Sequence, residues 1–189
     1  MRTIESWNTR YKEKYLQKLP PRIVQDLKTF PIPADLCEGE VQSTFIHGEI
    51  QSGKTLRAAF MFMQELKYLY LSFEDPDKFG KTLWVSFPDL LAALKETFET
   101  PEKRQSEVMR KYLDAHLLVI DDFMTTRPTD WVIDVLYHLV NHRYEYMKKT
   151  IITSNYDLQE LEKLLNDQRI TSRINRMCNT EEKQTSKQG

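Results

Sequence analysis

The feature that most constrains this sequence is a glycine-framed loop, HGEIQSGKTLRAAF, which runs from His47 to Phe60. It contains the pattern G-x-x-x-x-G-K-T, and two of the chain's five glycines frame it. The residues before it, Ser43 to His47, are typical of a short β-strand, and the apolar residues after it recur at helical spacing. The sequence therefore predicts a strand, a glycine loop and a helix in succession.

A loop between a buried strand and a helix presents backbone N–H groups at the positive end of that helix, where anions bind. Gly48 and Gly53 permit backbone angles and a close approach that a Cβ atom would block. Lys54 can reach the β- and γ-phosphates of a nucleotide, and the Thr55 hydroxyl can coordinate Mg²⁺. An ordinary tight turn is the alternative, but chance matches to this pattern are rare. The expected phosphate-binding residues are Gly48, Glu49, Ile50, Gln51, Ser52, Gly53, Lys54 and Thr55.

Two adjacent acids follow a second strand-like run, Leu117 to Ile120. The run does not alternate in polarity, as expected of a strand that is covered on both faces. Paired carboxylates at a strand tip repel each other, so they need a cation or hydrogen-bond donors nearby. We assign Asp121 to the metal and Asp122 to the base that polarises the attacking water. Two solvated acids at the start of a loop are the alternative.

A third strand-like run, TIITSN, ends in Asn155, whose amide is placed to orient water near a γ-phosphate. One further strand, Leu83 to Phe87, lies in sequence between the glycine loop and the acids. This order is typical of P-loop ATPases that insert a strand beside the first and carry a polar sensor on the following one. A Ser-Asn pair after a strand also commonly caps the next helix, which is the structural alternative.

The alternation of strand-like and helix-like segments predicts the fold. Buried strands between amphipathic helices give a three-layer α/β domain with a parallel sheet, here the five-stranded sheet of a P-loop NTPase. We expect a helical N-terminal arm over residues 1–42, an ATPase core over 43–178 and a mobile polar tail over 179–189. The tail is expected to be mobile because NTEEKQTSKQG contains no apolar side chain.

Composition limits the class of protein. Lys and Arg number 27 and Asp and Glu 28, which excludes a strongly basic coat for nucleic acid but not a local basic patch. Cys37 and Cys178 match no metal or redox spacing, so two unbridged thiols in a reducing compartment are expected. No secretory signal and no apolar run of about 18 residues is visible. We therefore expect a soluble cytoplasmic protein without a membrane partner.

Five segments carry a family resemblance: SFPDLLAALKETF, LLVIDDF, DWVIDVLYHLVNHRYE, TIITSN and RITSRINRM. Together they closely resemble the AAA+ helicase-loader ATPases of the DnaC and DnaI type, including phage versions, and the related transposition helper ATPases of the IstB type. The resemblance covers roughly residues 43 to 178. It implies an ATP- and Mg²⁺-dependent ATPase of a bacterial or phage-infected cell. Such a protein forms a ring or spiral and acts on a replicative DNA helicase and single-stranded DNA.

Two other functions stay open beside the helicase loader. A transposition helper of the IstB type would bind duplex DNA and recruit a transposase. A small-molecule kinase would share the glycine loop, but no arginine-rich lid or acceptor-site acid is visible between Asp121 and Asn155. The preference for single-stranded or duplex DNA separates the first two functions.

The resemblance also implies roles for several basic residues. In that family an arginine of an RxxSR-like segment projects into the neighbouring subunit's nucleotide site, and it maps here to Arg169 or Arg173. A solvated, ion-paired helix face is the alternative. In that family, the segment between the second strand and the acid pair faces the pore of the ring. Its basic residues are therefore candidates for DNA contacts. The alternative is a solvated helix pair in which nearby glutamates balance these basic charges. The candidates are Lys95, Lys103, Arg104, Arg110 and Lys111.

Three departures from the family pattern shape the expected activity. About 42 residues precede the core, which leaves no room for a separate helicase-docking domain. The chain ends 16 residues after Arg173, so we expect no C-terminal helical lid and no second sensor arginine. The acid after Asp121 is Asp122 rather than the longer glutamate of many ATPases. The first departure bears on which partner the protein binds, and the second and third predict slow ATP hydrolysis that depends on an oligomer or a partner.

Overall fold

A computed structural model describes residues 4–8, 12–30, 39–72, 78, 80–99, 105–125 and 128–184. Its centre is a five-stranded sheet with the strand order β2-β3-β4-β1-β5, in which every pair of neighbours is parallel. This confirms the predicted α/β fold with a central parallel sheet. The strands are β1 (Thr44–Gly48), β2 (Thr82–Ser86), β3 (Leu117–Phe123), β4 (Lys149–Ser154) and β5 (Asn179–Lys183).

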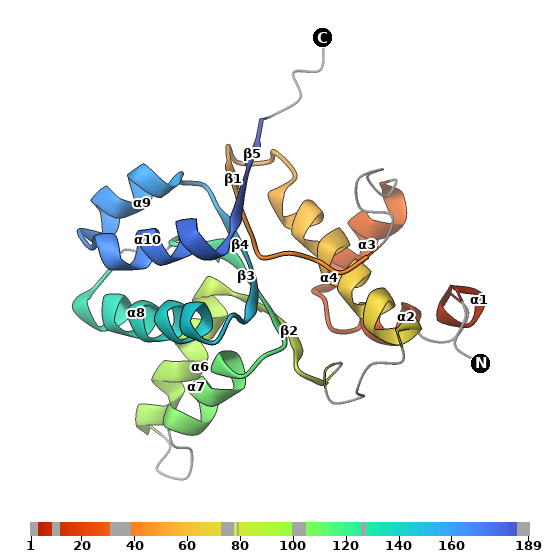
Figure 1. The fold of residues 1–189 in the computed structure, drawn as a ribbon, viewed down its shortest axis with the longest axis horizontal. Coiled ribbons are helices and arrows are strands. Elements are labelled where there is room, and N and C mark those ends of the chain that lie inside the picture. The colour runs from red at the N-terminus through yellow and green to blue at the C-terminus, as the bar shows by residue number, and fades with distance from the viewer. Residues whose placement is uncertain are drawn as a thin grey trace.

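Helices cover both faces of the sheet (Figure 1). One face carries α4 (Lys54–Leu71), against which the N-terminal helices α2 and α3 pack. These N-terminal helices are α1 (Ile4–Ser6), α2 (Lys12–Leu16) and α3 (Pro21–Thr29). The other face carries α6 (Phe87–Glu99), α7 (Gln105–Leu113), α8 (Asp130–Glu145), α9 (Leu158–Leu165) and α10 (Gln168–Met177). None of the helices in these described segments is long and apolar enough to span a membrane.

The core is divided by the sheet into two clusters. Phe45 and Ile152 belong to the cluster on the α8 side, whereas Ile46 and Ile151 belong to the cluster on the α4 side. Successive strand residues point to opposite faces, so a strand that is buried on both faces is apolar without interruption. Trp7 lies in the α4-side cluster, so this residue packs onto the same core as α4.

The prediction of a mobile tail is wrong for Asn179–Lys183, which form β5 beside β1. An edge strand pairs on one side only and keeps solvent-exposed side chains, so it needs no apolar residues. Arg57 of α4 anchors this strand, because its Nε and Nη2 atoms each donate to a carboxylate oxygen of Glu181 at 2.9 Å. Residues 185–189 of the predicted tail, and Cys37, lie outside the described residues.

A buried arginine joins three elements beneath the α8 face. Arg143 of α8 is 1% exposed, and burial lowers the pKa of its guanidinium to about 9. Three of its acceptors are carbonyls at and just beyond the C-terminal end of α7, where the helix dipole favours a cation. The residue therefore ties α7 and α8 to the start of β4. Its acceptors are the Thr150 hydroxyl and the carbonyls of Tyr112, Leu113, Ala115 and Lys149.

Candidate nucleotide-binding site

The glycine loop lies between the end of β1 at Gly48 and the start of α4 at Lys54. Gly53 is the N-cap residue of α4 and has a φ of 85°, while Gln51 has a φ of 66°. Both values lie in the left-handed region, which glycine enters at little cost and other residues enter at a cost of about 1–2 kcal/mol. The loop therefore holds one non-glycine residue, Gln51, in a strained conformation three residues before the helix begins.

The two glycines of the motif meet different requirements. A Cβ atom on Gly48, whose φ is 144°, would lie 1.9 Å from the Lys183 carbonyl oxygen, so β5 leaves no room for a side chain there. A Cβ atom on Gly53 would meet no heavy atom within 4 Å. Gly53 is thus required by its own backbone angle, and Gly48 is required by the approach of a neighbouring strand.

Lys54 is 6% exposed and folds back onto the loop. Its ammonium donates to the carbonyl oxygens of Gly48 at 2.9 Å and Glu49 at 2.5 Å. Burial lowers the pKa of Lys54, and the nearby charges of Asp122 and Asp121 act in the opposite direction. Among the described residues its acceptors are neutral oxygens, and a phosphate would offer stronger, charged ones.

The structure brings the two predicted metal ligands together. The Thr55 hydroxyl donates to Asp121 Oδ1 at 3.0 Å, across a sequence separation of 66 residues. Asp121 is 6% exposed, and burial raises the pKa of its carboxyl, as does the charge of Asp122. Hydrogen bonds from Thr153 and Thr55 act against this rise. A partly dehydrated carboxylate beside a hydroxyl is an oxygen pair of the kind that binds Mg²⁺.

Asp121 and Asp122 are adjacent in β3, where successive side chains point to opposite faces, and the strand is irregular at this point. β3 continues through both acids to Phe123, with a register shift against β4 between Ile120 and Phe123. Asp122 has a φ of 57° and is exposed, whereas Asp121 is buried. The positive φ of Asp122 coincides with this interruption of the β3–β4 pairing. The two adjacent acids therefore occupy different environments, one inside the site and one at its surface.

Thr153 is a site residue that sequence reasoning missed. It is fully buried, its hydroxyl donates to Asp121 Oδ1 at 2.6 Å, and it accepts the Asp122 backbone N–H at 3.0 Å. The sequence signal is a threonine two positions before Asn155 in TIITSN, and a threonine at this position is also typical of an ordinary buried strand. Asn155 itself is half-buried just beyond β4, and its amide makes no hydrogen bond with the part of the chain that is described.

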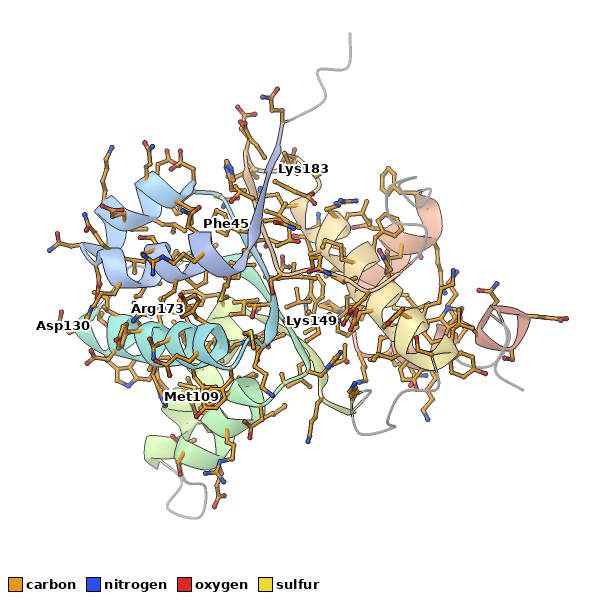
Figure 2. All side chains as sticks on the ribbon, viewed as in Figure 1. Phe45, Met109, Asp130, Lys149, Arg173 and Lys183 are labelled. Carbon is orange, nitrogen blue, oxygen red and sulfur yellow. The ribbon has the colours of Figure 1, made fainter. Side chains whose placement is uncertain are left out.

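The two candidate finger arginines belong to α10, on the opposite side of the sheet from α4 (Figure 1), and Figure 2 labels Arg173. Arg169 is paired with Asp167, with Nη2 and Oδ2 2.7 Å apart. Arg173 donates from Nε to Asn141 Oδ1 at 2.5 Å. Both guanidinium carbons lie over the Tyr137 ring, at 4.3 Å and 5.1 Å from its centroid. Neither arginine therefore faces the glycine loop of its own chain.

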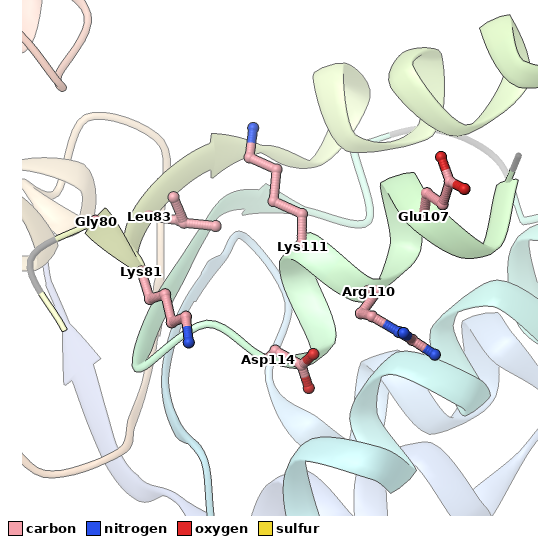
Figure 3. Close-up of a pocket in the computed structure, with 7 residues that line it drawn as sticks. All are labelled: Gly80, Lys81, Leu83, Glu107, Arg110, Lys111 and Asp114. Carbon is pink, nitrogen blue, oxygen red and sulfur yellow. The ribbon is translucent and has the colours of Figure 1, made fainter. Parts of the chain in front are cut away.

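The predicted DNA contacts are dispersed within the described segments. Lys95 lies over the Trp131 ring with its Nζ 5.4 Å from the centroid. Arg110 and Lys111 leave α7 in different directions beside a pocket of about 340 Å³ (Figure 3). Acids share this pocket, so its charge is mixed. Its lining residues are Gly80, Lys81, Leu83, Glu107, Arg110, Lys111 and Asp114. The candidates Lys103 and Arg104 lie outside the described residues.

Comparison with solved structures shows the same fold in three proteins of low sequence identity. The DnaC helicase loader is 21% identical, with a TM-score of 0.62 over 96% of this chain and 100% of that one. DnaI is 20% identical, with a TM-score of 0.62 over 91% and 94% of the two chains. AMPPCP-bound DnaA from Aquifex aeolicus is 17% identical, with a TM-score of 0.56 over 97% and 50%. The fold is therefore the α/β P-loop NTPase fold of AAA+ domains.

Comparison with curated protein sequences gives no significant match. A family model described as IstB-like ATP binding protein, in contrast, matches residues 2–183, which is almost the whole chain. The match includes the glycine loop, the acid pair, β4, α10 and β5. The chain belongs to the family of IstB-like ATP-binding proteins.

Proposed function

We propose that this protein is a Mg²⁺-dependent ATPase of the helicase-loader type. In this proposal ATP controls the binding of a replicative DNA helicase and single-stranded DNA, and the protein self-associates into a ring or spiral. The observation that carries the ATPase assignment is the 3.0 Å contact between Thr55 and Asp121. It joins the end of the glycine loop to the acid strand, which is the geometry a metal–nucleotide complex requires.

The oxygen donors at the site fit Mg²⁺. Thr55 and Asp121 would hold the ion, and the burial that raises the pKa of Asp121 would be offset by a divalent cation. No group of three or more His, Cys, Asp and Glu side chains among the described residues could hold a metal ion. Mg²⁺ typically keeps several waters and takes further ligands from phosphates. When bound, the ion neutralises charge on the phosphate oxygens.

Asp122 and Asn155 would act on the water that attacks the nucleotide. The exposed carboxylate of Asp122 would accept a proton from the attacking water, and the Asn155 amide would orient that water. The backbone N–H groups of residues 48–53 and the Lys54 ammonium would bind the phosphate oxygens. The products are ADP and inorganic phosphate.

Arg173 is the better candidate for the arginine supplied to a neighbouring subunit. Arg169 is already neutralised by Asp167, whereas Arg173 donates to two neutral oxygens, Asn141 Oδ1 and the Arg169 carbonyl. A guanidinium that is not paired with a carboxylate loses less when it transfers to a phosphate. Charge on the γ-phosphate oxygens in the transition state would then be stabilised from outside the subunit.

The proposal that the protein binds DNA and a helicase rests on its similarity to known structures rather than on a basic surface. The likeness to the DnaC helicase loader spans both chains nearly completely, which supports the loader assignment. The residues proposed to contact DNA remain Lys95, Lys103, Arg104, Arg110 and Lys111. Membership of the IstB-like family favours a second candidate, a transposition helper that acts on duplex DNA.

The ATP site is tested with Lys54→Ala and a matched control, Lys163→Ala, which removes an exposed lysine of α9. Affinity for a fluorescent ATP analogue is measured with and without Mg²⁺. We expect binding to be lost in Lys54→Ala and unchanged in Lys163→Ala, because only the first removes a charge-assisted phosphate contact. Wild-type affinity in Lys54→Ala would refute the site.

The DNA-binding role is tested by competition between single-stranded and duplex DNA of equal length, at several salt concentrations. A preference for the single strand that changes with the bound nucleotide is expected for a loader. A preference for duplex DNA would favour the transposition helper instead. Salt dependence is needed because phosphate contacts release counterions and dominate the affinity.

A further inference from the structure

We propose that Lys183, the last residue of β5, is a second cation of the nucleotide-phosphate site. The inference deepens the proposed ATP site and rests on it. The sequence predicts a mobile tail over these residues, and a mobile tail would hold no side chain at a fixed site. The position of β5 beside the glycine loop gives this lysine a role that the sequence motif does not reveal.

The register of β5 places Lys183 at the level of the loop. Glu181 pairs with Ile46 of β1, and Lys183 pairs with Gly48, the residue at which the glycine loop begins. The contact is close, because a Cβ atom on Gly48 would lie 1.9 Å from the Lys183 carbonyl oxygen. Figure 1 shows the end of β5 beside the loop that joins β1 to α4. Lys183 is therefore fixed next to the start of the phosphate loop.

The alternation of side chains along the strand sets the face on which Lys183 lies. The Glu181 carboxylate reaches Arg57 of α4, so residue 181 faces the α4 side of the sheet. Residues two apart in a strand share a face, so Lys183 faces α4 and Glu182 faces the other way. Burial agrees, because Glu181 and Lys183 are half-buried while Glu182 is exposed.

The contact between Arg57 and Glu181 also shows toward which end of α4 Lys183 lies. Arg57 lies in the first turn of α4, which begins at Lys54. Lys183 lies about 6.6 Å beyond Glu181, at about 3.3 Å per strand residue, toward the carboxyl edge of the sheet. The glycine loop and the N-terminal end of α4 lie at that edge. The Lys183 ammonium therefore extends on the side where the phosphates of a nucleotide would bind.

The charge of Lys183 is available for a ligand. Arg57 is occupied by Glu181, and Lys54 donates to the loop carbonyls, but no described carboxylate pairs with the Lys183 ammonium. A nucleotide triphosphate carries several negative charges, which one lysine, one helix N-terminus and one Mg²⁺ do not fully balance. A cation held on a rigid strand beside the loop adds to this balance without a further conformational change.

The test compares Lys183→Gln with Glu182→Gln, which changes a charge one residue away on the opposite face. Affinity for a non-hydrolysable ATP analogue is measured at about 0.15 M salt, where the Debye length is about 8 Å. We expect Lys183→Gln to bind about tenfold more weakly, as for one partly exposed charge-assisted contact. Glu182→Gln should change the affinity by less than about twofold, because its charge is screened and faces away.

Melting temperatures separate a binding role from a structural one. Without nucleotide, Lys183→Gln should melt like the wild type, since no described partner is lost; with nucleotide, its stabilisation should be smaller. Lys183→Arg keeps the charge and should restore most of the affinity, even if Lys183→Gln loosens β5. Wild-type affinity in Lys183→Gln, or an equal change in Glu182→Gln, overturns the inference. Absence of binding by the wild type would instead refute the ATP site itself.

Discussion

Replacing Thr153 by valine tests the polar support beneath the acid pair. The substitution nearly preserves side-chain shape but removes the hydroxyl that donates to Asp121 Oδ1 at 2.6 Å and accepts the Asp122 N–H at 3.0 Å. A hydrogen bond to a charged group contributes about 1.5–3 kcal/mol, and an unpaired buried N–H costs about 1–3 kcal/mol. The Asp122 N–H is only partly buried. We therefore expect the free energy of unfolding to fall by about 3 kcal/mol at neutral pH.

This loss should depend on pH in a definite direction. The folded-state pKa of Asp121 is raised by burial, so its stabilising contribution is present below the unfolded pKa and is lost as pH rises through the folded pKa. Removing the Thr153 donor raises that folded pKa further, because the ionised form loses a hydrogen bond. The difference in the free energy of unfolding between the wild type and Thr153→Val is therefore largest at a pH above both folded-state pKa values of Asp121. It shrinks as the pH falls through them. The part due to the Asp122 N–H remains at all pH values.

Urea unfolding of both proteins between about pH 4 and pH 8 measures this difference by linear extrapolation. Thr97→Val is the matched control, because this buried hydroxyl also makes a 2.6 Å bond but donates to the Leu94 carbonyl. Its destabilisation should not change with pH. Thr153→Ser should retain most of the stability. A pH-independent loss in Thr153→Val would show that the Asp121 carboxylate is not the group that Thr153 supports.

The glycine loop and α10 give two further predictions. Gly48→Ala should destabilise by more than about 2 kcal/mol, since its Cβ would lie 1.9 Å from Lys183, whereas Gly53→Ala should cost about 1 kcal/mol from its φ of 85° alone. Equal losses in urea unfolding would contradict this distinction. In the wild type, ATPase activity per protein should rise with protein concentration; Arg173→Ala should lose this activity but keep its nucleotide affinity. Mixing Arg173→Ala with Lys54→Ala should restore some turnover. Wild-type activity in Arg173→Ala would exclude a shared site.

The sequence predicts the parts of the fold that rest on periodicity and motif spacing. The buried strands β3 and β4, the amphipathic helices and the loop from Gly48 to Thr55 all occur where the pattern places them. β5 could not be predicted in the same way, because an edge strand is held by backbone pairing and by the Arg57–Glu181 contact rather than by apolar side chains. Arg143 was missed for a related reason, since its acceptors are mostly backbone carbonyls, which leave no sequence signal.

The site residues show a similar division. The pairing of Thr55 with Asp121 follows from the motif and from the rule that parallel strands end at one edge of the sheet. The left-handed backbone of Asp122 and the register shift between β3 and β4 could not be predicted, because two adjacent acids give no sequence signal for either. The requirement for Gly48 depends on β5, so it became visible only with the tertiary structure.

The position of β4 explains how one strand can serve both the metal-side acid and the ligand. β4 lies between β1 and β3, and its last residue pairs with His47 on one side and Phe123 on the other. Thr153 is fully buried and bonded to Asp121, so it is enclosed within the sheet. Asn155 lies two residues further toward the ligand and is only half-buried. Thr153 therefore supports the acid, and we propose that Asn155 senses the γ-phosphate. Because Asn155 lies just beyond the strand that carries Thr153, we propose that a displacement of Asn155 by a γ-phosphate would also move the donor that holds Asp121.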